Sequence, residues 1–170
     1  MKFEIAIIQD LVELTELLEN AKVEMETHHI YQWNQKYPNR NSIVNDIENE
    51  ELYILKNDEN QIVCMGTFTK NAIQGIQTKA VNDAIFIKRL IVKRDACGKG
   101  LSRELIDSFI KEKNIHDVDL YSCTNHTNIP MQKVLEKMNF VNIEAFTIKE
   151  RTTYGPFYLY YMKAGEQIDK

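Results

Sequence analysis

The sequence predicts an α/β (α+β) fold, in which a central sheet is flanked by helices. Segments of strand-like pattern alternate with segments of helical spacing along the whole chain. Two strand-like segments are joined by a short polar turn, and a later one leads through two glycines directly into an amphipathic helix. At 170 residues, with 44% hydrophobic residues, the chain is expected to form a single domain over residues 1–170 with a real core.

In the first half, the hydrophobic pattern gives two helices, a hairpin and an aromatic loop. Asp10 is placed to cap the first helix and Ser42 the second. Trp33 lies in the loop and is expected to plug an edge of the core. The predicted elements are a strand at 3–8, a helix at 11–27, a loop at 30–41, a short helix at 42–48, and hairpin strands at 52–55 and 61–68.

In the second half, strands and helices alternate. Pro130 suits a helix start because its missing N–H would be unsatisfied there in any case, and Asn139 suits a left-handed helix end. The expected order for the whole chain is β-α-α-β-β-β-α-β-α-β-β. The predicted elements are a flexible loop at 71–83, a central strand at 84–92, a helix at 98–113, a strand at 118–122, a loop at 124–128, a helix from 130, and strands from 140 and at 156–162.

Composition excludes several kinds of partner. A formal net charge of −4 argues against nucleic acid, which favours a broad basic face. No apolar run approaches the roughly 20 residues that span a bilayer, and the N-terminus has no signal-peptide pattern, so a cytoplasmic protein is expected. Three widely spaced cysteines suggest neither a disulfide framework nor a zinc site. Glu24 and His28 stand four apart, but no third metal ligand accompanies them.

The turn from Cys97 to Ser102, Cys-Gly-Lys-Gly-Leu-Ser, predicts an anion site. Gly98 and Gly100 let the backbone adopt positive φ and approach a ligand closely. The first N–H groups of the next helix lack carbonyl partners, and the helix dipole adds partial positive charge there. Such a turn binds phosphate or pyrophosphate. The cations nearby are Lys93, Arg94, Lys99 and Arg103.

Two common phosphate motifs do not fit this turn. A Walker loop requires GxxxxGK followed by Ser or Thr, which the turn does not supply. The Rossmann pattern GxGxxG requires a third glycine where Arg103 stands, and it normally lies near the first strand of its domain. A glycine-rich turn without a ligand stays open as the alternative on this evidence.

The turn resembles motif A of the GNAT family of N-acetyltransferases. That motif reads Arg/Gln-x-x-Gly-x-Gly/Ala after a strand, and its backbone amides hold the pyrophosphate of acetyl-CoA. Here it reads Cys97-x-x-Gly100-x-Ser102, with cysteine in place of Arg or Gln. Residues 128–140 resemble the family's late motif, Asn-x-x-Ala-x-x-Leu-Tyr-Glu-Lys-x-Gly-Phe. The matching positions are Asn128, Glu136, Lys137 and Phe140.

The resemblance covers residues 3–163 and implies a mixed, mostly antiparallel central sheet. It also implies that acetyl-CoA is the co-substrate, that no metal is needed, and that the strand at 84–92 splays away from the next one. Backbone groups of the first strand would then bind the pantetheine arm, with Asn128 beside it. The implied coenzyme-binding residues are Leu90, Ile91, Val92, Cys97, Gly98, Lys99, Gly100, Leu101, Ser102 and Asn128.

The implied activity is transfer of an acetyl group from acetyl-CoA to a primary amine, by direct attack within a ternary complex. The acceptor would be a small-molecule or peptide amine, and the sequence does not say which. Neither nucleic acid nor a membrane is expected as a partner, and a homodimer is one oligomeric state that the sequence leaves open. A non-catalytic acetyl-CoA-binding module is the alternative function.

One departure from the family motivates that alternative. The tyrosine that often protonates the leaving thiolate falls, in register, at Leu135, which cannot donate a proton. Another group could do so, the thiolate could leave unprotonated, or catalysis could be lost. Candidate acids are Tyr121, Cys123 and Tyr154. No single catalytic base is assigned, and the candidates near the substrate cleft of the family are Glu24, Glu26 and Glu144.

Overall fold

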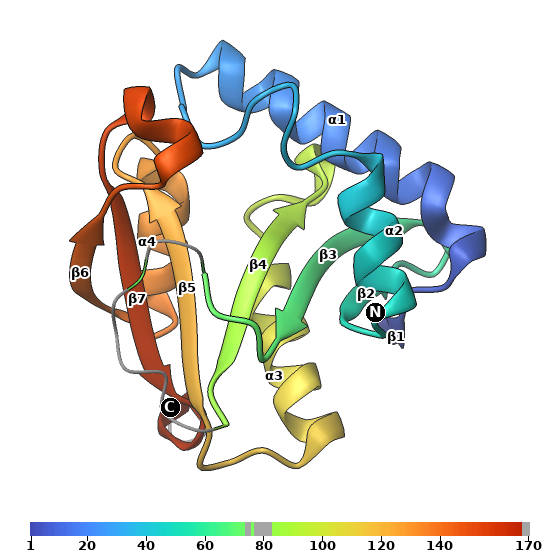
Figure 1. Ribbon diagram of the computed structural model, residues 1–170. Coiled ribbons are helices and arrows are strands. Elements are labelled where there is room, and N and C mark those ends of the chain that lie inside the picture. The colour runs from blue at the N-terminus through green and yellow to red at the C-terminus, as the bar shows by residue number, and fades with distance from the viewer. Residues whose placement is uncertain (74–75, 77–82, 168–170) are drawn as a thin grey trace.

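A computed structural model describes residues 1–73, 76 and 83–167. Their strands form one seven-stranded sheet in the order β1-β2-β3-β4-β5-β7-β6 (Figure 1). All neighbouring strands are antiparallel except β4 and β5, which are parallel. The strands are β1 (Lys2–Ile5), β2 (Leu52–Lys56), β3 (Ile62–Thr69), β4 (Ile85–Val92), β5 (Asp119–Asn125), β6 (Val141–Phe146) and β7 (Phe157–Lys163). This arrangement confirms the predicted fold class and element order.

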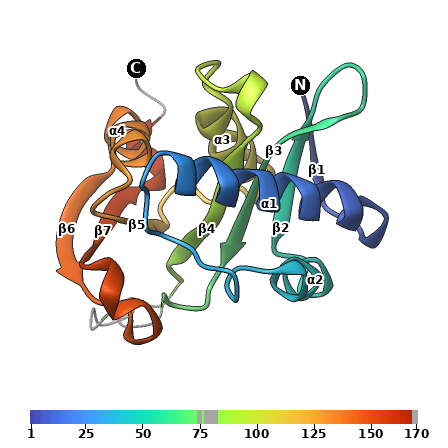
Figure 2. The ribbon, with the colours of Figure 1, turned by 90° about the horizontal axis from the view of Figure 1, so that it is seen from above.

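The helices cover both faces of the sheet. Figure 2 shows α1 crossing above the strands, with α2 on one side of the sheet and α3 and α4 on the other. The α-helices are α1 (Leu11–Thr27), α2 (Arg40–Glu48), α3 (Leu101–Lys113) and α4 (Ile129–Lys137), and the 3₁₀ turns are η1 (Ile8–Asp10), η2 (Arg94–Ala96), η3 (Lys149–Tyr154) and η4 (Ala164–Gln167). The apolar sides predicted for these helices therefore pack into two separate cores, one on each face of the sheet.

Two helix caps differ from expectation. The Asp10 carboxylate makes no cap bond to α1. It accepts from Ile7 N at 3.0 Å and pairs with Lys56 Nζ at 3.1 Å. Helix α2 begins two residues before Ser42, and Asn39 is its N-cap. Asn39 Oδ1 accepts from Ser42 N at 3.1 Å, and Ser42 Oγ accepts from Asn39 N at the same distance. Ser42 therefore closes a reciprocal capping pair rather than capping the helix itself.

Strand β5 is longer than predicted because β7 extends it. Cross-strand pairs continue to Asn125, opposite Phe157, so the predicted loop at 124–128 begins later. The predicted connecting loop at 71–83 lies largely outside the described residues. At the other end of α4, Asn139 has a φ of 67°, as the sequence predicted for a helix end.

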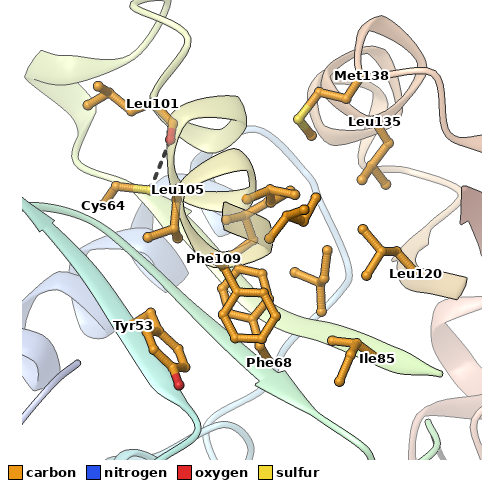
Figure 3. Packing of buried hydrophobic residues seen from close by; sticks show 14 of the residues in the cluster. Tyr53, Cys64, Phe68, Ile85, Leu101, Leu105, Phe109, Leu120, Leu135 and Met138 are labelled. Carbon is orange, nitrogen blue, oxygen red and sulfur yellow. Dashed lines mark hydrogen bonds between the residues drawn. The ribbon is translucent and has the colours of Figure 1, made fainter. Parts of the chain in front are cut away.

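A large core lies between the sheet and helices α3 and α4. It includes Leu105 of α3, Leu120 of β5 and Leu135 of α4, each with no exposed surface. In Figure 3, Leu135 points from α4 toward Leu120. On the opposite face, α1 and α2 cover a second core, against which Trp33 packs with part of its side chain, as expected for an aromatic loop residue.

Candidate functional site

Strands β4 and β5 separate halfway along their length. Their parallel register runs from Ile85 opposite Leu120 to Ile87 opposite Ser122 and ends there. Ser122 Oγ donates to the Ile87 carbonyl at 3.1 Å at this last pair. Beyond it, the segment 90–92 still pairs with β3 but has no partner on its β5 side in the described structure. Its free edge is the kind of surface to which an extended ligand can add main-chain hydrogen bonds.

A β-bulge lies where the strands separate. Between the pairs Met65–Ile91 and Thr67–Lys88 the register shifts, and Arg89 there has a φ of 51°. A bulge bends a strand and increases its twist, which turns β4 away from β5. Arg89 is thus a non-glycine residue in the left-handed region, a conformation that the surrounding structure must hold in place.

The bulge is held by a buried ion pair. Arg89 donates to both carboxylate oxygens of Asp46 on α2, from Nε at 2.7 Å and from Nη2 at 2.6 Å. Its Nη1 donates to Tyr37 Oη at 2.7 Å, and Thr67 Oγ1 donates to Asp46 at 2.7 Å. These charge-assisted bonds tie α2, β3 and the loop after α1 to the bulge.

The glycine turn ends at the N-terminus of α3. Gly98 and Gly100 have φ values of 79° and 75°, and a Cβ placed on either would meet nothing within 4 Å. Gly100 is the N-cap of α3 and offers no side-chain cap, so the first N–H groups of the helix are left for another acceptor. Glycine is needed here for its conformation and leaves open space in front of the backbone.

A cleft of about 1430 Å³ runs from the free edge of β4 to this turn. All the predicted coenzyme-binding residues line it except Lys99, which instead lines a shallow depression along the outside of α3. Opposite them the cleft is walled by α1 and α4. The predicted residues on the cleft are Leu90, Ile91, Val92, Cys97, Gly98, Gly100, Leu101, Ser102 and Asn128. The structure thus brings Leu90 and Asn128, which are 38 positions apart in the sequence, to the same cleft.

Two of the cationic side chains around the turn already have partners in the protein. Arg94 on the cleft pairs with Glu24 of α1, and Glu24 also lies 3.6 Å from His28. Arg103 Nη2 donates to the Lys137 carbonyl at the end of α4, at 2.5 Å. Arg94 and Arg103 therefore fasten α1 and α4 to the turn as well as lending it positive charge. Burial, with Glu24 and Asp95 nearby, raises the pKa of the Cys97 thiol.

A buried amide network joins the loop after α1 to the end of β5. Gln32 Oε1 accepts from Thr124 Oγ1 at 2.6 Å, from Asn125 N at 3.1 Å and from Asn128 Nδ2 at 2.9 Å. Asn128 Oδ1 accepts from Met131 N and so caps α4. Asn128 lies on the cleft, but its side chain serves this network. No sequence pattern pointed to Gln32.

Alignment of Leu135 with the family's proton-donating tyrosine implies that residue 135 faces the coenzyme, and this expectation is wrong. Leu135 has no exposed surface, belongs to the core under α3 and α4, and does not line the cleft. Its neighbour Val134 lines the cleft instead. The helix register around Pro130 therefore turns residue 135 inward, and a leucine there is explained by packing.

The candidate acids and bases do not gather in the cleft. Tyr121 is buried and stacks on Phe86, with ring centroids 5.3 Å apart. Burial raises the pKa of Cys123 to about 11, so its thiol holds its proton at neutral pH. Of the remaining candidates only Glu24 lines the cleft, where it is paired with Arg94. Those off the cleft are Tyr154, Glu26 and Glu144.

Among the residues that the structure describes, no three His, Cys, Asp or Glu side chains are grouped to hold a metal ion. None of the helices in that part of the chain is long and apolar enough to cross a membrane.

The fold resembles those of several solved acetyltransferases, some of which are named as GNAT-family members. A GNAT acetyltransferase from Streptococcus agalactiae has a TM-score of 0.79 at 19% identity, covering 95% of this chain and 94% of its own. One from Listeria monocytogenes has a TM-score of 0.72 at 16% identity, covering 95% and 94%. The ribosomal-protein-S18-alanine N-acetyltransferase from Escherichia coli has a TM-score of 0.64 at 11% identity, covering 96% and 93%. No family model and no curated protein matches the sequence. The chain therefore has the GNAT fold.

Proposed function

We propose that this protein is an N-acetyltransferase that moves an acetyl group from acetyl-CoA to a primary amine. The observation that carries the proposal is the cleft between the free edge of β4 and the Gly98–Gly100 turn. It combines an unpaired strand edge, suited to the amide-bearing pantetheine arm, with a helix N-terminus suited to pyrophosphate. The fold is shared by a GNAT-family acetyltransferase and by a ribosomal-protein-S18-alanine N-acetyltransferase, which supports the proposal.

The residues present fit this co-substrate. The positions in front of Gly98 and Gly100 are open, so phosphate oxygens can approach backbone N–H groups. The side chains of Leu90, Val92 and Met131 give the middle of the cleft an apolar lining, which suits the methylene groups of pantetheine. Acetyl-CoA, when bound, supplies an activated thioester.

The chain's own part in the reaction is positioning. Holding an amine and a thioester in attack geometry converts a bimolecular step into an effectively unimolecular one. The bulge at Arg89 fixes where β4 leaves β5, and backbone N–H groups beside the split are available to stabilise a developing oxyanion. The amine must lose a proton before it attacks. We propose that water in the open split carries that proton, because Glu24, the one of the three bases named from the sequence that lines the cleft, is paired with Arg94.

The sequence argument for a non-catalytic acetyl-CoA-binding module no longer applies. It rested on leucine at the position of the family's tyrosine, and that position lies in the core. Thiols ionise near pH 8.5, so a coenzyme thiolate can leave without a dedicated acid. The alternative remains an outcome of the experiment.

The test is release of free thiol from acetyl-CoA in the presence of a panel of primary amines, together with calorimetric binding of acetyl-CoA. The proposal expects binding, and thiol release that depends on one class of amine. Binding without release for any amine would favour the non-catalytic module. No binding would contradict both readings.

A further inference from the structure

Two residues that flank the opening of the split are Lys88 on β4 and Cys123 on β5. Each is the first residue past the last pair, Ile87–Ser122. Phe86 and Tyr121, two positions earlier on each strand, stack with their planes within 19°. Because side chains two apart share a face, Lys88 and Cys123 lie on that same face of the sheet. This is also the face on which Arg89 meets α2.

Arg151 of η3 lies on the β7 side of Cys123, between two aromatic rings. Its guanidinium carbon lies 5.1 Å from the centroid of the Tyr37 ring and 5.0 Å from that of Phe157. Nη1 donates to the Gln32 carbonyl at 2.6 Å, which fixes the orientation of the planar group. Positive charge on Arg151 and on Lys88 acts on Cys123, in each case lowering the thiol pKa against the larger effect of burial.

These two cations are half-buried, and neither forms an ion pair with a carboxylate of the described residues, although the charge of the neighbouring Glu150 acts on Arg151. Within the part of the chain that the structure describes, Lys88 Nζ has one hydrogen bond, to the Ala72 carbonyl at 3.5 Å. Burial lowers the pKa of Lys88, as it does that of Arg151. The carboxylates nearest Lys88 are already engaged, since Asp46 binds Arg89 and Glu51 accepts from Thr69 Oγ1 at 2.7 Å.

Arg151 keeps unused donors. Apart from Nη1, no guanidinium nitrogen of Arg151 has a hydrogen-bond acceptor in the part of the chain that the structure describes. A guanidinium has five N–H donors in a planar fork that matches carboxylate or phosphate oxygens. A preformed, aromatic-clamped fork beside a second cation is a suitable receptor for an oxyanion.

We propose that the acceptor amine carries an oxyanion, a carboxylate or a phosphate, that binds between Lys88 and Arg151 beside Cys123. The proposal rests on the acetyltransferase function proposed above. The anion would hold the acceptor on the α2 face, so that its amine reaches into the split toward the thioester. A polyamine, whose charges are all positive, is disfavoured by the same cations.

The test compares amine acceptors with and without an anionic group. An α-amino acid, its carboxamide, an aminoalkyl phosphate and a polyamine are assayed by thiol release. The proposal expects kcat/KM to be at least about tenfold higher for an anionic acceptor than for the carboxamide, the gain from a charge-assisted hydrogen bond. The two anionic acceptors distinguish carboxylate from phosphate. A carboxamide or polyamine used as well as the anionic acceptors would overturn it.

Variants locate the anion site. Arg151→Gln and Lys88→Gln should raise KM for the anionic acceptor about tenfold, a larger change than either variant causes in KM for the carboxamide or for acetyl-CoA. Lys133→Gln, an exposed cation on α4, is the matched control and should change none of these KM values. Equal effects of all three variants, or none, would contradict the assignment.

Binding of acetylated products separates a failure of the anion site from a failure of the proposed acetyltransferase function. Calorimetry in the presence of coenzyme A compares an N-acetyl amino acid and an N-acetyl aminoalkyl phosphate with the N-acetyl amino acid amide, and requires no turnover. Binding of either anion that is lost in Arg151→Gln supports the anion site even in an inactive protein. Equal binding of all three, or binding of none, counts against it.

Discussion

Arg89 of the β4 bulge and Asp46 of α2 form a two-bond ion pair, with N···O distances of 2.7 and 2.6 Å. Both side chains are largely buried, with 9% and 8% of their surface exposed. The pair connects the strand that opens the split to the helix that covers this face. It is therefore a structural requirement of the site as much as of the fold.

Removing one partner should be costly. Asp46→Ala leaves the Arg89 charge buried without its counterion, and we expect a loss of about 3–5 kcal/mol in the free energy of unfolding. Lys70→Ala breaks a pair with Asp83 in which both side chains are exposed, and it should cost less than about 1 kcal/mol. Urea denaturation of both variants measures the difference, and similar losses would contradict the role assigned to Asp46.

Acetyl-CoA should stabilise the folded protein by mass action. At about 100 times its dissociation constant it adds about 2.7 kcal/mol, which corresponds to a rise in Tm of about 5–10 °C for a chain of this size. A thermal melt with millimolar acetyl-CoA measures the shift. An unchanged Tm would contradict coenzyme binding in the cleft.

The glycine turn offers a matched pair of variants at the two ends of α3. Gly100 and Asn114 both adopt the left-handed conformation, with φ values of 75° and 52°. Alanine at either should cost about 1–2 kcal/mol of stability. Only Gly100→Ala places a Cβ in the open space at the turn, so only it should weaken acetyl-CoA binding. Equal affinities in calorimetry would show that the turn does not contact the coenzyme.

The three cysteines should react at different rates. Thiolate is the reactive form, and burial raises the pKa of all three thiols. Cys97 is exposed, Cys123 is half-buried and Cys64 is fully buried, so alkylation at pH 8 should proceed in that order, with Cys97 slower than a free thiol. Acetyl-CoA should protect Cys97, because it lines the cleft. Peptide mass mapping that finds no protection would separate Cys97 from the coenzyme site.

Leu135→Tyr should harm the protein without helping catalysis. A larger, polar-tipped side chain in a site with no exposed surface overpacks the core, at about 1–3 kcal/mol. Leu135→Met, close in volume, should cost less than about 1.5 kcal/mol. A tyrosine variant with higher kcat and unchanged stability would restore the idea that position 135 faces the thioester.

Local patterns predicted the elements well and the contacts between distant elements poorly. The glycine turn and the Pro130 helix start are local signals, and both were placed correctly. The sequence predicts a central strand at 84–92 with no bulge, although Lys88 and Arg89 interrupt an apolar run. Two adjacent charges in a buried strand are a sequence signal for a bulge with dedicated partners, but Asp46 and Tyr37, its partners here, could be identified only in three dimensions.

The register of α4 shows a second limit. The late motif aligned Leu135 with a tyrosine of the family, yet side-chain direction depends on how the helix packs against β5 and α3. A shift of one residue turns a helical position by about 100°, which is enough to exchange Val134 for Leu135 on the cleft. Arg151 and Gln32 could not be predicted at all, since they lie in short irregular segments without periodicity.

Product analysis tests the central claim most directly. The protein is incubated with acetyl-CoA and each amine of the panel, and free thiol and acetylated amine are measured together by chromatography and mass spectrometry. For the accepted class of amine, we expect both products to accumulate at equal initial rates, with no thiol release when the amine is omitted. Thiol release without acetylated amine, or bound acetyl-CoA left intact with every amine, would contradict the central claim.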